Sequence, residues 1–212
     1  MTGMRDGYLA AASIAVDLLA DAAVARQWDC DSALPAMPVS ALAGHLARQI
    51  FNLGEVLAGG ACADPPVSLA EHYARSEWTD AGLDDEPNVV VRQGGAAEAA
   101  AGPAALTARA REVLARLAAR LAAEPPGLVV LVPWGPWPLT LDDFLVSRMM
   151  EIAVHCDDLA QSVGLPTPVF PAGVADAVVV LLARLAARRH GAPAIIRAFS
   201  RAERAPASIA AF

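Results

Sequence analysis

The residues whose types and spacing could perform chemistry lie in one predicted helix, over residues 140–164. A polar stripe follows helical spacing there, beside an apolar one: Phe144, Arg148, Glu151, His155, Asp158 and Ser162. Glu151 and His155 are four residues apart, so they lie one above the other on the helix. A carboxylate oxygen and an imidazole nitrogen placed in this way can bind one metal ion. The pair therefore indicates part of a metal site.

A third ligand has to come from another helix, and His45 is the candidate. It lies beside Leu42 and Leu46, at the shoulder of the apolar stripe of a helix predicted over residues 39–58. Three protein ligands with an open fourth position are typical of catalytic zinc sites, and facing helices of a bundle supply such ligands. Two alternatives stay open. The polar stripe could be a solvated, ion-paired helix face, and His45 could be a hydrogen-bonded core residue.

The two helices that must position these residues are well marked. Thr140 can cap the helix over 140–164, with Asp143 three residues later as in a capping box, and Gly164 ends it. The helix over 39–58 ends at a Gly-Gly pair. Its apolar residues repeat at the spacing of one helix face: Leu42, Leu46, Ile50, Leu53 and Leu57.

The remaining elements predict an all-α protein. Residues 128–132 give the one strong strand signal, and a Pro- and Gly-rich turn follows, so we expect a short strand or loose hairpin before the fourth long helix. Residues 61–94 are the least regular part and are expected to cover a site. Further helices are expected over residues 6–25, 68–75, 104–123, 171–190 and 193–204. The predicted fold is a four-helix bundle with one or two extra C-terminal helices.

Composition excludes several classes of protein. The chain is 56% hydrophobic but only 5% aromatic, and its net charge is −7. Its basic residues are all arginine and are scattered, whereas a nucleic-acid binder carries a basic patch. The apolar runs are too short to span a bilayer, and the first residues do not resemble a signal peptide. Three cysteines without a CxxC motif fit reduced thiols. We therefore expect a cytoplasmic protein with no nucleic-acid or membrane partner.

Three motifs carry a resemblance to a known family. They are Gly44-His45-Leu46-Ala47, then Val132-Pro-Trp-Gly-Pro136 followed by Leu141-Asp-Asp-Phe-Leu145, and, most specific, Arg148-x-x-Glu151-x-x-x-His155-x-x-Asp158-Leu159. On these motifs the chain resembles the metal-binding domain of the actinobacterial mycothiol-dependent maleylpyruvate isomerase family. That domain belongs to the wider DinB-like group of four-helix bundles. The resemblance covers roughly residues 5–165.

The resemblance implies that His45, Glu151 and His155 hold a divalent metal, zinc by preference. An open position would take water or the sulfur of mycothiol. Zinc deprotonates a coordinating thiol, and the thiolate is the nucleophile. The implied organisation is a DinB-like bundle over residues 1–165 and a helical extension over 166–212 packed on it. Because residues 166–212 predict only helices, we expect no separate substrate domain of the kind that this family carries after the bundle.

Four further residues are candidates for the site. Asp158 is expected to orient the imidazole one turn before it or to assist proton transfer. Arg148 is expected to pair with Glu151 or to face an anionic ligand. For both residues, a simple ion pair on the helix surface is the alternative. Trp134 and Trp137 are expected to bind the thiol cofactor as walls of a pocket, the alternative being that they close one end of the bundle.

The expected function is that of a metal-dependent, mycothiol-using transferase or isomerase acting on a small electrophilic metabolite, as a monomer or homodimer. The alternative is a non-catalytic metal- or small-ligand-binding protein on the same bundle. Three other residues are expected outside the chemistry. Cys156 is predicted to be a buried, inert thiol, His72 to be exposed, and His190 to be a cation at a helix end.

Overall fold

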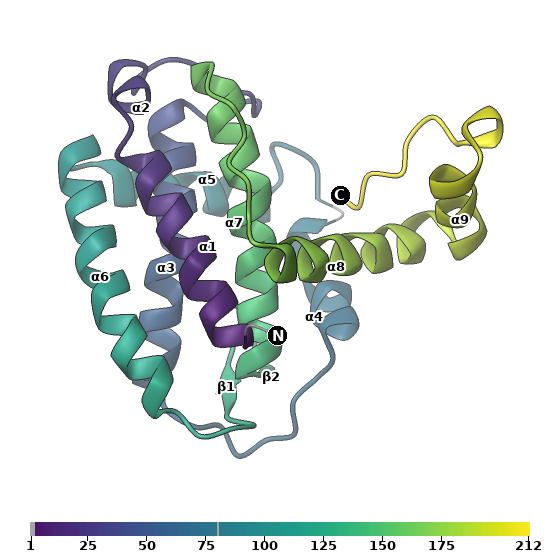
Figure 1. Cartoon of the computed structure of the whole chain (residues 1–212), viewed down its shortest axis with the longest axis horizontal. Helices are drawn as coiled ribbons and strands as arrows, with labels where there is room; N and C mark the ends of the chain where they lie inside the picture. Colours follow the sequence, from purple (N-terminus) through teal and green to yellow (C-terminus); the bar gives the residue numbers. More distant parts are fainter. Residues whose placement is uncertain (1–2, 80) are drawn as a thin grey trace.

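The computed structural model describes residues 3–79 and 81–212. Four long helices lie side by side in Figure 1 and form the core: α1 (Met4–Leu19), α3 (Val39–Gly59), α6 (Pro103–Ala123) and α7 (Leu141–Val163). Their apolar faces meet in one buried cluster. The predicted all-α, four-helix architecture is confirmed.

The two helices that carry the predicted metal ligands form as the sequence indicates. The Thr140 hydroxyl accepts a hydrogen bond from the backbone N–H of Asp143 at 3.1 Å, which satisfies a donor of the first turn of α7. At the other end Gly164 has φ 71°, a left-handed conformation that glycine adopts without strain. All five residues of the predicted apolar stripe on α3 are buried.

The first predicted helix, over residues 6–25, is two helices in the structure. α1 ends at Leu19, and α2 spans Ala22–Arg26. The Asp21 carboxylate accepts a hydrogen bond from the backbone N–H of Ala23 at 2.7 Å and caps α2. A short polar side chain that bonds to nearby backbone competes with helix continuation in this way.

Residues 86–99 form α5 (Glu86–Ala99), so the prediction of irregular structure up to residue 94 was wrong from residue 86 onward. Gly94 and Gly95 indicated a break because glycine weakens helices. In the structure a Cβ on Gly95 would overlap the carbonyl oxygen of Ala41, and one on Gly44 would overlap the carbonyl oxygen of Gly95. The glycines therefore allow α5 and α3 to approach at backbone contact.

The remaining elements before α7 are short. α4 (Leu69–Arg75) matches the helix predicted over 68–75, with Ser68 as its N-cap, and a 3-10 turn, η1 (Glu77–Thr79), follows. β1 (Val129–Leu131) and β2 (Pro138–Thr140) pair antiparallel, with Val130 opposite Leu139. This is the hairpin expected before α7. Its connection carries both Trp134 and Trp137.

The C-terminal segment forms α8 (Ala172–His190), α9 (Ala192–Ser200) and a 3-10 turn, η2 (Ala202–Arg204). α8 crosses α7 and then projects away from the bundle, with α9 at its far end (Figure 1). The chain then returns toward the bundle, where the ring of Phe212 lies 4.8 Å from that of Trp78 and 6.0 Å from that of Tyr73. The predicted division at residue 165 stays a prediction.

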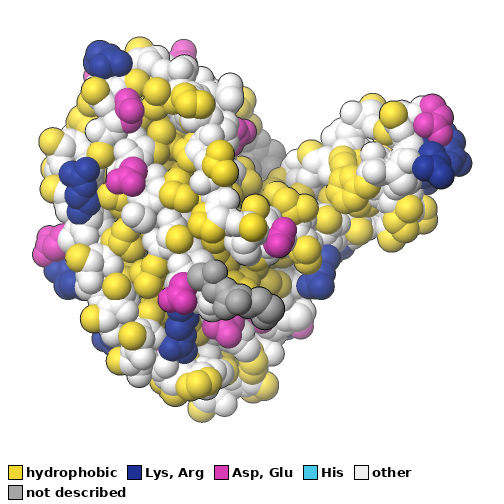
Figure 2. Space-filling view, viewed as in Figure 1, with side chains coloured by type: hydrophobic (Ala, Val, Ile, Leu, Met, Phe, Trp, Pro, Cys, Tyr) yellow, Lys and Arg dark blue, Asp and Glu magenta, His cyan; other side chains and the backbone are white. Residues whose placement is uncertain are grey.

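The surface agrees with the scattered charges of the sequence. On the face shown in Figure 2, arginines and acidic residues are interspersed singly over the bundle rather than gathered by sign. Within residues 3–79 and 81–212, none of the helices combines the length and the apolar character needed to cross a membrane.

The contact of α5 with α3 leads to a stability prediction. We expect Gly95→Ala to lower the free energy of unfolding by about 2–3 kcal/mol, because the added methyl group must push two helix backbones apart. Gly59→Ala is the matched control, since nothing lies within 4 Å of a Cβ added there and alanine favours the helix. Urea unfolding measures both. Equal stabilities of the two variants would contradict close packing at Gly95.

Candidate metal centre

The structure brings the three predicted ligands together across the contact of α3 and α7. The Glu151 Oε2 atom lies 3.2 Å from Nε2 of His155 and 3.7 Å from Nε2 of His45. The two imidazole rings meet edge to face, with centroids 4.6 Å apart. One ligand atom from each residue lies within 4.8 Å of the others. We call this set the triad, and it could hold a metal ion.

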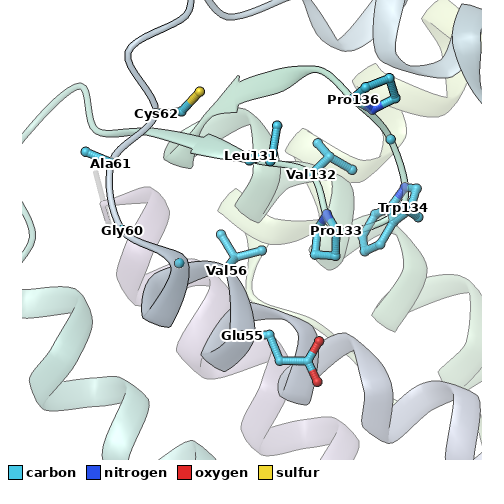
Figure 3. Close-up of a pocket in the computed structure, with 12 residues that line it drawn as sticks. Glu55, Val56, Gly60, Ala61, Cys62, Leu131, Val132, Pro133, Trp134 and Pro136 are labelled. Atoms are coloured by element: carbon cyan, nitrogen blue, oxygen red, sulfur yellow. The ribbon is translucent and has the colours of Figure 1, made fainter.

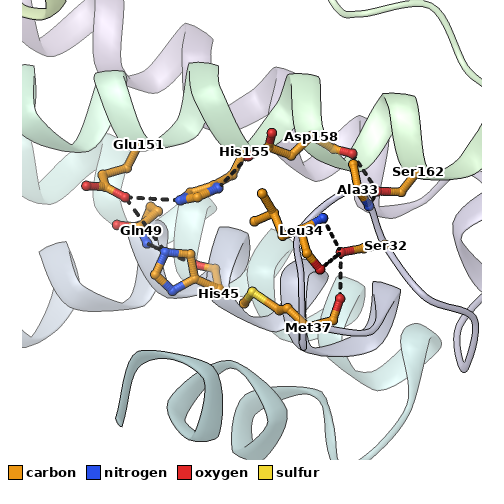
Figure 4. Close-up of polar contacts among 10 residues, drawn as sticks. All are labelled: Ser32, Ala33, Leu34, Met37, His45, Gln49, Glu151, His155, Asp158 and Ser162. Carbon is orange, nitrogen blue, oxygen red and sulfur yellow. Dashed lines mark hydrogen bonds and ion pairs between the residues drawn. The ribbon is translucent and has the colours of Figure 1, made fainter. Parts of the chain in front are cut away.

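Asp158 orients one member of the triad. Its Oδ2 atom lies 3.0 Å from Nδ1 of His155, which leaves Nε2 facing Glu151 (Figure 4). Metal-binding histidines have this arrangement, in which a carboxylate fixes the tautomer and the ring orientation. One of the two roles expected for Asp158, orientation of the imidazole, therefore has the required geometry.

His45 is held by a residue that the sequence analysis missed. The Gln49 side chain, 1% exposed, donates to the backbone carbonyl of His45 at 2.9 Å, and its Nε2 lies 3.4 Å from Nε2 of the imidazole. The signal was a polar residue one turn after His45 on an otherwise apolar face. Nδ1 of His45 is buried and has no hydrogen-bond partner among the described residues.

Burial and charge set the protonation of the triad. Burial acts to raise the pKa of Glu151, but hydrogen bonds to both imidazoles and the charge of Arg148 hold that pKa well below its usual range. Burial acts to lower the pKa of His155, yet hydrogen bonds to Asp158 and Glu151 outweigh it and raise the pKa to about 9. Burial is the main cause that lowers the pKa of His45. The metal-free centre therefore carries its proton on His155.

The donor set fits a divalent cation. Two imidazole nitrogens and one carboxylate oxygen suit zinc, and two packed helices hold them. The polar stripe of α7 is not a solvated face, because Phe144, Arg148 and Glu151 are buried. That alternative is therefore wrong for the part of the stripe that carries the site.

Arg148 forms neither the ion pair with Glu151 nor the ion pair on the helix surface that the sequence analysis considered. It is 5% exposed, which excludes a pair on the helix surface. No ion pair to Glu151 occurs within 4.0 Å. Its guanidinium donates instead to Oε1 of Gln49 at 2.5 Å and to Oγ of Ser147 at 3.2 Å. It also lies 4.6 Å from the ring of Trp134.

The two tryptophans occupy different places. Trp134 lines a surface cavity of about 660 Å³ between the end of α3 and the hairpin, together with residues that include Glu55, Cys62 and Pro136 (Figure 3). Trp137 does not line this cavity. Its indole N–H donates instead to Nδ1 of His72 at 2.9 Å. Trp134 is thus linked to the triad through Arg148 and Gln49, whereas Trp137 packs against α4.

The structure corrects the expectation that His72 is exposed. His72 is 1% exposed, not exposed as predicted, because α4 places it against the Trp137 donor. Burial, followed by the charge of Arg148, lowers the pKa of His72 to about 4. Cys156 is fully buried as predicted, and burial raises the pKa of its thiol to about 12. A buried thiol with a raised pKa stays protonated, which agrees with the inert thiol that was predicted.

Asp158 gives a prediction about protonation. In metal-free protein, Asp158→Asn should move the pKa of His155 downward from about 9, because the largest favourable interaction of the imidazolium is lost while burial remains. Titration by NMR measures this shift. Asp157→Asn is the control, since that carboxylate accepts from Thr167 instead. An unchanged pKa of His155 would contradict the assigned contact.

His72 gives a prediction about pH and stability. Its folded pKa of about 4 lies below the ordinary value of 6.5, so the unfolded chain takes up the proton first as the pH falls. The contribution of neutral His72 to the free energy of unfolding is fully present above pH 6.5 and is lost as the pH falls toward 4. About 2 kcal/mol of that contribution is lost by pH 4.5. His72→Asn keeps an acceptor for Trp137 and should lose correspondingly less stability between pH 7 and 4.5 in metal-free urea unfolding. His190→Asn, at an exposed site, should behave as the wild type.

Comparison with known proteins identifies the family of this chain. Neither a search of curated proteins nor a search of solved structures finds a match to this chain. The sequence model of the mycothiol maleylpyruvate isomerase N-terminal domain matches residues 9–160, a span that contains the whole triad and Asp158. This match covers well over half of the chain and confirms the resemblance seen in its motifs. The chain belongs to the mycothiol maleylpyruvate isomerase N-terminal domain family.

Proposed function

We propose that this protein is a metal-dependent enzyme that uses a low-molecular-weight thiol, mycothiol, to transfer or isomerise a small electrophilic metabolite. The observation that carries the proposal is the convergence of His45, Glu151 and His155 inside a domain of this family. The family description names both the thiol and an isomerase, and the triad is the group of residues that could bring a thiol to a metal.

The residues of this chain have distinct parts in the proposal. His45, Glu151 and His155 would hold the ion and leave a further position open for the thiol. Asp158 keeps the Nδ1 proton of His155 in place, so that Nε2 offers its lone pair to the ion. Gln49 restrains His45 from the next turn of α3. A zinc ion held there supplies a Lewis acid that lowers the pKa of a coordinating thiol.

The surroundings of the triad favour this chemistry. The side chains of the three residues are only 11–17% exposed, so few water molecules compete for them. In such a site the effective dielectric constant is low and charges interact more strongly than in water. Trp134 contacts Arg148 and also walls the cavity at the end of α3, so it would contact the part of the thiol cofactor that does not react.

Metal analysis tests the centre. Purified wild-type protein should retain about one equivalent of zinc after gel filtration, and His155→Ala should retain far less, because two ligands hold zinc much more weakly than three. His190→Ala is the matched control, at an exposed histidine away from the triad. A His155→Ala variant that keeps the full zinc content would contradict the assigned ligands.

Thiol titration tests the chemistry and separates the enzyme from its alternative. Mycothiol added to cobalt-substituted protein should produce a sulfur-to-metal charge-transfer band, and the zinc protein should accelerate addition of mycothiol to electrophiles. If metal binds but mycothiol changes neither the spectrum nor the rate, the protein is a non-catalytic metal- or ligand-binding member of the family.

A further inference from the structure

Arg148 is a buried cation whose partners among the described residues are all neutral. Its hydrogen bonds go to the Gln49 amide and the Ser147 hydroxyl, from Nη1 and Nε respectively. Its other contacts are aromatic: the rings of Trp134 and Phe144 lie 4.6 and 5.4 Å from its central carbon. Within residues 3–79 and 81–212, Arg148 has no carboxylate within 4.0 Å, and Nη2 makes no hydrogen bond.

A buried cation in this state is destabilising. Removing a charge from water is costly unless an opposite charge accompanies it. The acidic groups nearby are already engaged, because Glu151 faces both imidazoles and Asp158 faces His155. With a divalent cation in the triad, these two carboxylates would not balance the ion and Arg148 together. The metal-loaded site would therefore carry an excess of positive charge.

A second donor without a hydrogen-bond partner among the described residues lies on α4. Tyr73 of α4 is 3% exposed, and its hydroxyl is buried with no hydrogen-bond partner among the described residues. Its ring packs at 4.9 Å on His72, which in turn lies 6.5 Å from Trp134, the ring that covers Arg148. Burial is the main cause that raises the pKa of the phenol, so its hydroxyl stays protonated and can donate.

We propose that Arg148 and Tyr73 form an anion subsite beside the triad, which binds the carboxylate of the electrophilic substrate. A carboxylate has two oxygens, and two donors are free to bind them: Nη2 of Arg148, which makes no hydrogen bond within the described residues, and the buried phenol hydroxyl. The anion would neutralise a guanidinium that is otherwise unpaired. The identification of the anion as a substrate group rests on the function proposed above, whereas the subsite itself rests on the unpaired groups.

Calorimetric titration with propionate and with its uncharged analogue propionamide tests the subsite. Propionate should bind the zinc protein and propionamide should not bind measurably. Arg148→Gln should weaken propionate binding at least 50-fold and Tyr73→Phe about 10-fold, as expected for loss of a charged partner and of one hydrogen bond to an anion. Arg109→Gln is the matched control. That arginine also lies over a ring, Phe51 at 4.0 Å, but it is paired with Glu98.

A stability measurement separates binding from a structural role. Tyr73→Phe removes only an unsatisfied hydroxyl, so its thermal unfolding midpoint should equal or exceed that of the wild type while propionate affinity falls. If the midpoint falls and the affinity does not, Tyr73 is structural and the proposal is overturned. Equal binding of propionate and propionamide, or full propionate binding by Arg148→Gln, also overturns it.

Metal-free protein distinguishes this proposal from the proposed function. The unpaired groups are present without an ion, so propionate should still bind there, more weakly, and Arg148→Gln should still abolish that binding. If the chain proves unable to bind zinc or mycothiol, this result upholds the anion subsite by itself. Loss of the Arg148 dependence in metal-free protein, with normal zinc binding, refutes the subsite alone.

Discussion

A buried carboxylate between two helices is the interaction on which this site depends. Glu151 projects from α7 into the contact with α3, where one oxygen faces an imidazole from each helix. Without those imidazoles the ionised carboxylate would strongly destabilise the fold. The groups that satisfy Glu151 in the metal-free protein are also the groups that a cation would bind. Stability and preorganisation of the site therefore come from one contact.

The position of His45 follows from the packing of α5 on α3. Gly44 and Gly95 let the two backbones touch, and His45 is the residue next to that contact. Because packed helix backbones cannot shift without opening the crossing, the imidazole is attached to one of the most constrained points of α3. α5 thus supports the metal centre although none of its own side chains belongs to the triad.

The features that were predicted correctly from the sequence depend on residues close together in the chain. The cap at Thr140, the end at Gly164 and the apolar stripes depend on neighbouring residues, and α3 and α7 formed as expected. The i, i+4 spacing of Glu151 and His155 is likewise local. His45 was the candidate third ligand from its place beside the apolar stripe of α3, and the family resemblance supported it. α5 was missed because its glycines have meaning only against α3, a partner about fifty residues away. His72 was misjudged for the same reason, since its burial depends on Trp137.

Among the described residues, one of the two buried side-chain atoms without a hydrogen-bond partner lies in the triad. Other buried polar groups in the described part of the chain have partners: the Tyr8 hydroxyl donates to the carbonyl of Gln49, and Thr107 donates to that of Leu19. The two buried side-chain atoms without a partner among the described residues are Nδ1 of His45, in the triad, and the hydroxyl of Tyr73. Native proteins leave few such groups. One of the two thus belongs to the triad itself, which is the pattern expected where a fold gives up local stability for recognition.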